Sequence, residues 1–103
     1  MNADAKINWL KKNAEKSIIW LDSRGFKYSA WAGIFKYKNK YYYVEHDGTA
    51  NEYFYPHSCA EVSAEEAKKI ITENFKDFET VKQKCSELDL TITEEEYERM
   101  IGF

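Results

Sequence analysis

The chain has 103 residues, of which 44% are hydrophobic and 32% are charged, and its formal net charge is −3 at pH 7. These values are typical of one globular domain with a single core, so we expect one compact domain over residues 1–103. The two cysteines exclude a disulfide framework, and four Gly and one Pro leave no room for a low-complexity linker.

The first predicted element is a long amphipathic helix from Asp4 to Ser23. Its apolar residues recur at steps of three and four, which places them on one face at about 100° per residue. Asp4 is the expected N-cap, and Gly25 is the expected left-handed stop. A competing interpretation, which we rank second, makes residues 17–22 a strand. The apolar stripe consists of Ile7, Leu10, Ala14, Ile18 and Leu21.

A β-hairpin is expected next, because two stretches rich in aromatic and β-branched residues flank Asn39. A two-residue turn at Asn39 and Lys40 would place Tyr37 opposite Tyr42, on a core-like face. A third strand is expected at residues 52–55, after a turn signal of Asp-Gly. The opposite face of the hairpin would then carry Lys36, Lys38, Tyr41 and Tyr43.

Two or three helices are predicted after the strands. Ser63 and Glu66 have the spacing of a capping box, and Thr93 and Glu96 repeat it. Between these two starts, the apolar spacing that follows Asp77 predicts another helix. The order of one helix, three antiparallel strands and two or three helices favours an α+β fold, with helices covering one face of the sheet.

The sequence carries no recognisable motif for catalysis or for binding a cofactor or a metal. His46 and Cys59 could form a base and a nucleophile, but no signature of a catalytic cysteine surrounds Cys59. A metal site would need His57 and Cys85 as well, and Cys85 lies on the apolar stripe of its predicted helix. We therefore predict no catalytic residue, no metal site and no cofactor, and an unrecognised enzyme is the third hypothesis.

The sequence also lacks a membrane span and a secretory signal. Its apolar runs are short, such as the four residues from Ile18 to Leu21, whereas a span needs roughly 20. The N-terminal residues lack a basic start, an apolar middle and a small-residue cleavage site. We therefore expect a cytoplasmic protein with no membrane partner and with two free thiols.

Charge is divided unevenly along the chain. Residues 1–44 hold nine Lys and Arg against three Asp and Glu, and residues 45–103 hold six against fifteen. The favoured interpretation is that these oppositely charged halves lie against each other. The lysines and tyrosines of the hairpin could also bind nucleic acid by stacking and phosphate contacts. However, the sequence pI of about 5.4 is far below the value above 9 that marks such proteins.

Two other regions could form a surface for a protein partner. Trp9 and Trp20 are eleven residues apart, so they would share the side of the predicted helix opposite its core stripe. We favour the interpretation that the sheet or the C-terminal helices cover this side too. The alternative is a partner surface, because tryptophan is a common anchor in protein interfaces. The last helix begins with three acidic residues, Glu94, Glu95 and Glu96. A homodimer formed by pairing hairpin edges is a further use of so much aromatic surface.

In kind, a small acidic α+β chain without motifs looks like the small inhibitors of bacteria and their phages, such as immunity proteins and anti-defence proteins of the anti-CRISPR kind. Such proteins occupy a site on a partner and need no chemistry of their own. We therefore expect a stoichiometric protein-binding protein, with nucleic-acid or nucleotide binding by the hairpin as the alternative. The expected partner-binding residues are Lys36, Lys38, Tyr41, Tyr43, Trp9, Trp20, Glu94, Glu95 and Glu96.

Overall fold

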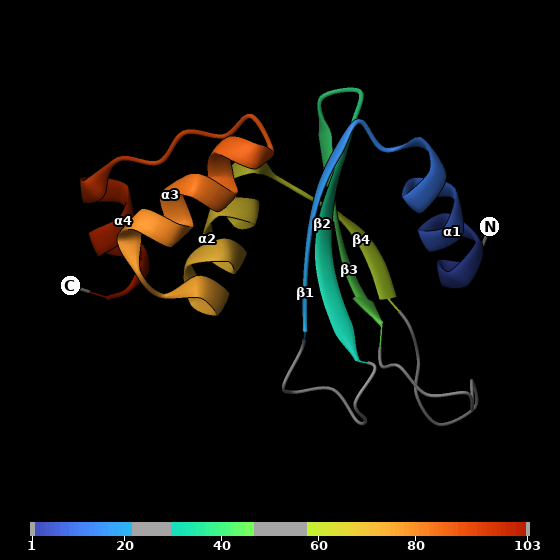
Figure 1. The fold of residues 1–103 in the computed structure, drawn as a ribbon, viewed down its shortest axis with the longest axis horizontal. Helices are drawn as coiled ribbons and strands as arrows, with labels where there is room; N and C mark the ends of the chain where they lie inside the picture. The colour runs from blue at the N-terminus through green and yellow to red at the C-terminus, as the bar shows by residue number, and fades with distance from the viewer. Residues whose placement is uncertain (1, 22–29, 47–57, 103) are drawn as a thin grey trace.

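The computed structural model describes residues 2–21, 30–46 and 58–102, and these residues form an α+β fold (Figure 1). The predicted class is confirmed, because an N-terminal helix is followed by an antiparallel sheet and then by three helices. None of the described helices is long and apolar enough to cross a membrane. The elements are α1 (Ala3–Asn13), β1 (Lys16–Leu21), β2 (Trp31–Tyr37), β3 (Lys40–His46), β4 (Ser58–Val62), α2 (Ala64–Phe75), α3 (Phe78–Glu87) and α4 (Glu94–Met100).

The first helix is shorter than predicted, because the chain leaves α1 after Asn13 and forms β1. The strand interpretation that ranked second is therefore the correct one. Ile18 and Ile19 are adjacent β-branched residues, which favour an extended backbone, and all six residues of β1 pair with β2. The predicted stripe had combined Ile7 and Leu10 of α1 with Ile18 of β1, which are buried residues of two different elements. Its last member, Leu21, is 80% exposed and is not a core residue.

The helix caps follow the local sequence closely. The N-cap of α1 is Asn2 rather than Asp4, and the Asn2 side chain accepts a hydrogen bond from a backbone N–H of the first turn. Both predicted capping boxes are confirmed, at Ser63 for α2 and at Thr93 for α4. The helix predicted after Asp77 is α3, and Asp77 is its N-cap. Short-range signals therefore fix where the C-terminal helices begin.

The hairpin turn lies one residue earlier than predicted. Lys38 and Asn39 form the turn, so that Tyr37 pairs with Lys40. Both turn residues have positive φ, 49° and 64°, which suits the right-handed twist of a two-residue hairpin. Moving the turn by one residue changes each cross-strand partner by two positions. The strand residues Lys36, Tyr41 and Tyr43 therefore stay on the predicted face, whereas Lys38 lies in the turn.

The sheet contains a strand that the sequence analysis did not predict. β4 pairs antiparallel with β3 and forms one edge, in the strand order β1-β2-β3-β4. Its sequence, Ser-Cys-Ala-Glu-Val, carries little β-propensity, so the pairing with β3 decides its conformation. The predicted strand at residues 52–55, the Asp-Gly turn before it and the predicted stop at Gly25 lie outside the described residues.

Helices cover both faces of the sheet rather than one. Figure 1 shows α2, α3 and α4 on one side of the sheet and α1 on the other. Each face holds its own cluster of buried apolar side chains, so the sheet is the middle of three layers. The cluster under the C-terminal helices contains Ile18, Ile34, Tyr41, Ala67, Ile71, Val81, Cys85, Leu88, Leu90 and Ile92, and the cluster under α1 contains Ile7, Leu10, Phe35 and Val44.

Adjacent residues of β1 test the assignment of these faces. Ile18 is 4% exposed and Ile19, on the opposite face, is 51% exposed. We expect Ile18→Ala to lower the free energy of unfolding by about 2–5 kcal/mol, because it removes buried methyl groups and leaves a cavity. Ile19→Ala should cost less than about 1 kcal/mol. Urea unfolding at low protein concentration measures both, and equal losses would contradict the assignment.

Candidate functional site

The two tryptophans of the predicted surface lie on opposite faces of the sheet. Trp20 belongs to β1 and packs under the C-terminal helices, with its ring centroid 5.4 Å from that of Phe75. Its buried Nε1 has no hydrogen-bond partner among the described residues. Trp9 lies on α1, is 39% exposed and meets the ring of Tyr37 edge-on at 4.7 Å. The prediction of a shared tryptophan face is therefore wrong, and Trp9 is the member that remains at the surface.

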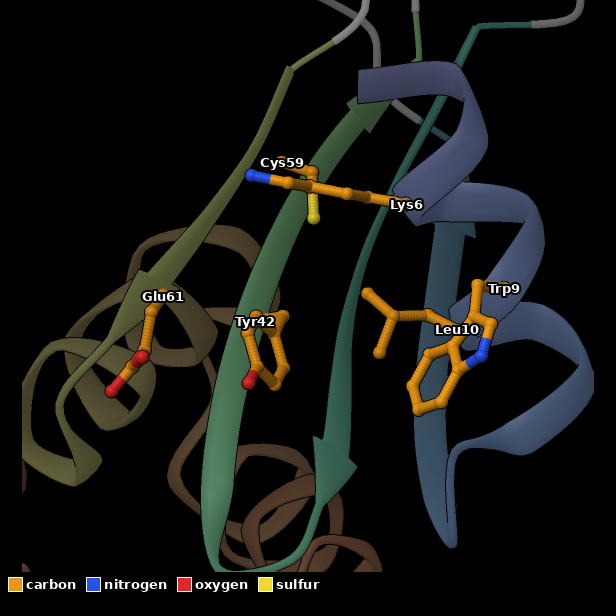
Figure 2. A pocket seen from close by; sticks show the side chains of 6 residues that line it. All are labelled: Lys6, Trp9, Leu10, Tyr42, Cys59 and Glu61. Atoms are coloured by element: carbon orange, nitrogen blue, oxygen red, sulfur yellow. The ribbon is translucent and has the colours of Figure 1, made fainter. Parts of the chain in front are cut away.

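Trp9 forms one wall of an open groove between α1 and the β3-β4 edge of the sheet (Figure 2). Trp9 and Leu10 come from α1, Tyr42 rises from β3, and the groove has a volume of about 400 Å³. In Figure 2 the Lys6 side chain extends from α1 across Cys59. The lining residues are Lys6, Trp9, Leu10, Tyr42, Cys59 and Glu61.

The spacing of the lining residues along α1 and along β4 places their side chains on the same side of each element. Lys6, Trp9 and Leu10 have the spacing of three and four residues that places side chains on one side of a helix. Cys59 and Glu61 are two apart on β4, so they share a face of the sheet. Tyr42 pairs directly with Glu61 across the β3-β4 ladder. The sequence analysis missed the groove because it neither predicted β4 nor placed α1 over this face.

The thiol of Cys59 lines the groove, and it is poorly activated as a nucleophile. Burial raises the pKa of its thiol, and the nearby positive charge of Lys6 offsets this only in part. A thiol with a raised pKa is mostly protonated at neutral pH and is a weak nucleophile. The imidazole of His46 stacks on Trp31, with ring centroids 5.2 Å apart. His57 lies outside the described residues.

The lysine and tyrosine face of the hairpin lies under the C-terminal helices. Tyr41 is 8% exposed, and its hydroxyl donates a hydrogen bond to the Leu88 carbonyl oxygen at 3.0 Å. Tyr43 packs against the same apolar layer and stacks on Trp20, with ring centroids 6.4 Å apart. Tyr41 and Tyr43, which were expected as partner-binding residues, therefore pack in or against the core. Their rings are part of the core that joins the sheet to the helices.

The lysines of this face also serve the fold. Lys16 and Lys36 contact the two carboxylate oxygens of Asp89 at 2.6 and 3.0 Å. Hydrogen bonds from Lys16 and then Lys36 lower the pKa of Asp89, and the bond to Asp89 raises the pKa of Lys36. Lys38, in the turn, donates its backbone N–H to a Glu15 carboxylate oxygen at 2.7 Å. This ion cluster ties β1 and β2 to the chain that follows α3.

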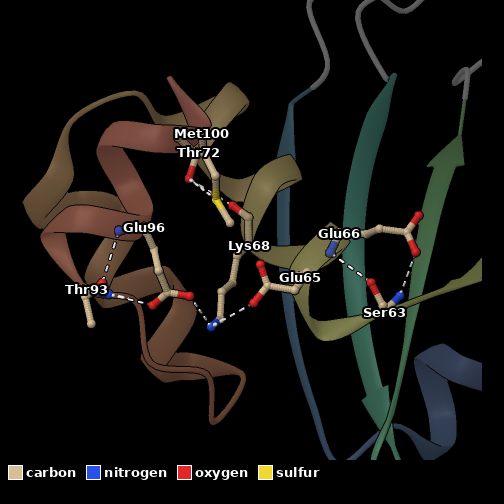
Figure 3. Close-up of polar contacts among 8 residues, drawn as sticks. All are labelled: Ser63, Glu65, Glu66, Lys68, Thr72, Thr93, Glu96 and Met100. Atoms are coloured by element: carbon tan, nitrogen blue, oxygen red, sulfur yellow. Dashed lines mark hydrogen bonds and ion pairs between the residues drawn. The ribbon is translucent and has the colours of Figure 1, made fainter. Parts of the chain in front are cut away.

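The acidic start of α4 is partly structural (Figure 3). Glu96 accepts hydrogen bonds from the backbone N–H of Thr93 and from Lys68 Nζ, both at 3.0 Å. The Thr93 and Lys68 bonds lower the pKa of Glu96. The contact with Lys68 joins α2 to α4, whereas Glu94 and Glu95 are exposed. Of the three predicted glutamates, these two therefore remain accessible to a partner.

Neither the described residues nor the comparisons point to a known activity. In the described parts of the chain, no three or more His, Cys, Asp and Glu side chains are grouped so that they could hold a metal ion. Comparison with protein-family models, curated proteins and solved structures finds no match to the chain. A function must therefore be inferred from the surface that the fold presents.

The two cysteines should differ sharply in reactivity. Cys85 is fully buried on α3, and burial raises the pKa of its thiol to about 11, whereas Cys59 lines the groove. At pH 8 a colorimetric disulfide reagent should label Cys59 slowly in the native protein and Cys85 only after unfolding in urea. Cys59→Ser should remove the native signal. Labelling of both thiols at one rate in the native protein would contradict the burial of Cys85.

Asp89 should make the fold sensitive to acid. Its pKa is lower in the folded protein than its ordinary value near 3.8, so its charge stabilises the fold above that pH. This contribution is lost as the pH falls through the lowered value, because the carboxylate is then protonated. Asp89→Asn suits the test, since Asn tolerates the positive φ of 60° at this position. The variant should lose less stability than the wild type between pH 5 and pH 2, and parallel losses in urea unfolding would refute this role.

Proposed function

We propose that this chain is a small stoichiometric protein-binding protein of the inhibitor kind, comparable in mode of action to immunity proteins and phage anti-defence proteins. It acts by occupying a site on its partner and carries out no reaction. The observation that supports this proposal most strongly is the groove of Figure 2, which places the exposed Trp9 beside an apolar floor. Tryptophan is enriched among the residues that anchor protein interfaces, and such anchors lie in or beside pockets.

The shape and chemistry of the groove suit an apolar side chain of a partner protein. Leu10 and Tyr42 offer apolar surface, and the charged groups of Lys6 and Glu61 lie at the rim. A partner side chain that fills the groove would bury apolar area on both molecules, which is the main favourable term in association. The charges at the rim would orient the partner and speed its approach more than they would strengthen binding.

The two other hypotheses find less support in the arrangement of the chain. Nucleic-acid binding was based on the lysines and tyrosines of the hairpin, but Tyr41 is buried and Lys36 is bound to Asp89. An enzyme that used Cys59 would need a thiolate at neutral pH, and burial of this thiol disfavours the thiolate. Binding through shape and apolar contact needs neither group.

The proposal predicts that Trp9 dominates the affinity for the partner. The partner can be recovered by affinity capture from the native host, identified by mass spectrometry and titrated calorimetrically against purified variants. Trp9→Ala should weaken binding by about 10- to 1,000-fold, because the truncation removes the largest apolar group of the groove. Circular dichroism of the free variant would establish that it remains folded.

Ile101→Ala is a matched control, because Ile101 is 41% exposed and lies beyond α4, away from the groove. Its affinity should equal that of the wild type. Lys6→Ala should mainly slow association. Recovery of nucleic acid in place of a protein would refute the proposal, as would equal affinities of the two alanine variants at positions 9 and 101.

A further inference from the structure

The side of the sheet that carries the groove has a basic surface. On α1, Lys6 precedes Trp9 by three residues and Lys12 follows it by three, and all three side chains are exposed. This spacing places them along one side of the helix, with the indole ring between the two lysines. In the described parts of the chain, the exposed lysines on this side of the sheet are Lys6, Lys11, Lys12, Lys38 and Lys40.

The charges that line the groove itself are not equally available to a partner. The Glu61 carboxylate lies 3.8 Å from Lys40 Nζ, so a lysine of this chain already compensates its charge. Lys6 extends from α1 across Cys59 (Figure 2). Burial raises the pKa of the Cys59 thiol, and the positive charge of Lys6 partly offsets this rise, which shows that the charge acts within the groove. The groove therefore offers a positive charge beside its apolar floor.

The other side of the sheet is acidic. Residues 63–102, which form α2, α3, α4 and their connections, hold eleven Asp and Glu against six Lys and Arg. Figure 1 shows these helices and α1 on opposite sides of the sheet. Charges of opposite sign on two sides of a small protein steer a charged partner as it approaches. An acidic partner is therefore directed to the side on which the groove opens.

We propose that the groove receives an acidic segment of the partner protein, in which an apolar side chain has Asp or Glu on both sides. This inference rests on the proposed function and specifies the chemistry of the partner. The apolar side chain contacts Trp9, Leu10 and Tyr42 in the groove. The flanking carboxylates pair with Lys6 and Lys12.

The spacing of the two lysines suits such a segment. Lys6 and Lys12 are six residues apart on α1, so their Cα atoms are separated by about 9 Å along the helix axis. About three residues of extended chain span the same distance. Acidic residues on both sides of one apolar residue are then within reach of both ammonium groups. The groove volume of about 400 Å³ is at the small end of the roughly 300–1,000 Å³ of ligand pockets, which suits one or two side chains.

A protein segment fits this surface better than nucleic acid does. The apolar floor of the groove favours an apolar side chain, because burial of apolar area drives association. A polynucleotide would bring many phosphates to a chain whose pI of about 5.4 is unlike that of nucleic-acid-binding domains. A short acidic segment needs only the few lysines around Trp9.

Peptide display tests the chemistry of the partner segment. Short random peptides are selected on the wild-type protein, and those that also bind Trp9→Ala are removed. The retained peptides should carry an apolar residue with Asp or Glu on both sides. Retained peptides that are basic or uncharged would overturn this inference and leave the proposed function standing, because a protein segment would still bind the groove. Failure to retain any peptide would overturn it too, as would Trp9-dependent binding of a single-stranded oligonucleotide.

Charge reversal tests the lysines directly. In fluorescence anisotropy, a retained acidic peptide should bind Lys6→Glu about 10-fold more weakly than the wild type, because a like charge replaces an attraction. The same peptide with Lys in place of its acidic residues should bind Lys6→Glu more tightly than the wild type, which a loss of fold could not produce. Lys82→Glu is the matched control, at an exposed lysine of α3. Its affinity should stay within about twofold of the wild type, because screening limits its charge to roughly 8 Å. Equal losses in the two variants would overturn the inference.

Discussion

The structure depends on one constraint, which is that both faces of the sheet are apolar and both must be covered. Ile34 and Phe35 are neighbours on β2, point to opposite faces and are each almost fully buried. A sheet of this kind cannot leave one side to water, because the exposed apolar area would oppose folding. The two faces of the sheet are covered to different extents. Three helices cover one face, and a single helix of 11 residues covers the other.

The short helix explains where the accessible surfaces lie. α1 is about 16 Å long and about 10 Å wide, which is enough to cover roughly two strands spaced 4.8 Å apart. It contacts β2 and the edge strand β4 and seals Phe35 and Val44 in the middle of the sheet, but it leaves Ile19 of β1 exposed. At one margin the groove opens beside Trp9, and at the other Ile19 is exposed on β1. The groove beside Trp9 and the exposed side chain of Ile19 therefore have one cause, which is that a single short helix is too small to cover all four strands.

On the face that three helices cover, basic residues from the first part of the chain contact an acidic residue from the second part. Lys16 and Lys36 come from the basic first part of the sequence, and their shared partner Asp89 comes from the acidic second part. On the α1 face, Lys40 of β3 lies 3.8 Å from Glu61 of β4. These contacts agree with the interpretation that the oppositely charged halves lie against each other. Lys36 and Lys40 of the hairpin therefore each lie beside an acidic side chain.

The features that were predicted correctly from the sequence are those that depend on residues close together in the chain. The capping boxes at Ser63 and Thr93 are local hydrogen bonds, and the helices begin where these signals place them. The end of α1 was missed because Ile18 fits the helical spacing, and only pairing with β2 reveals it as a strand residue. β4 was missed for the same reason, since its pairing with β3 and not its composition makes it a strand. The groove needs both elements in place, so no local signal could have found it.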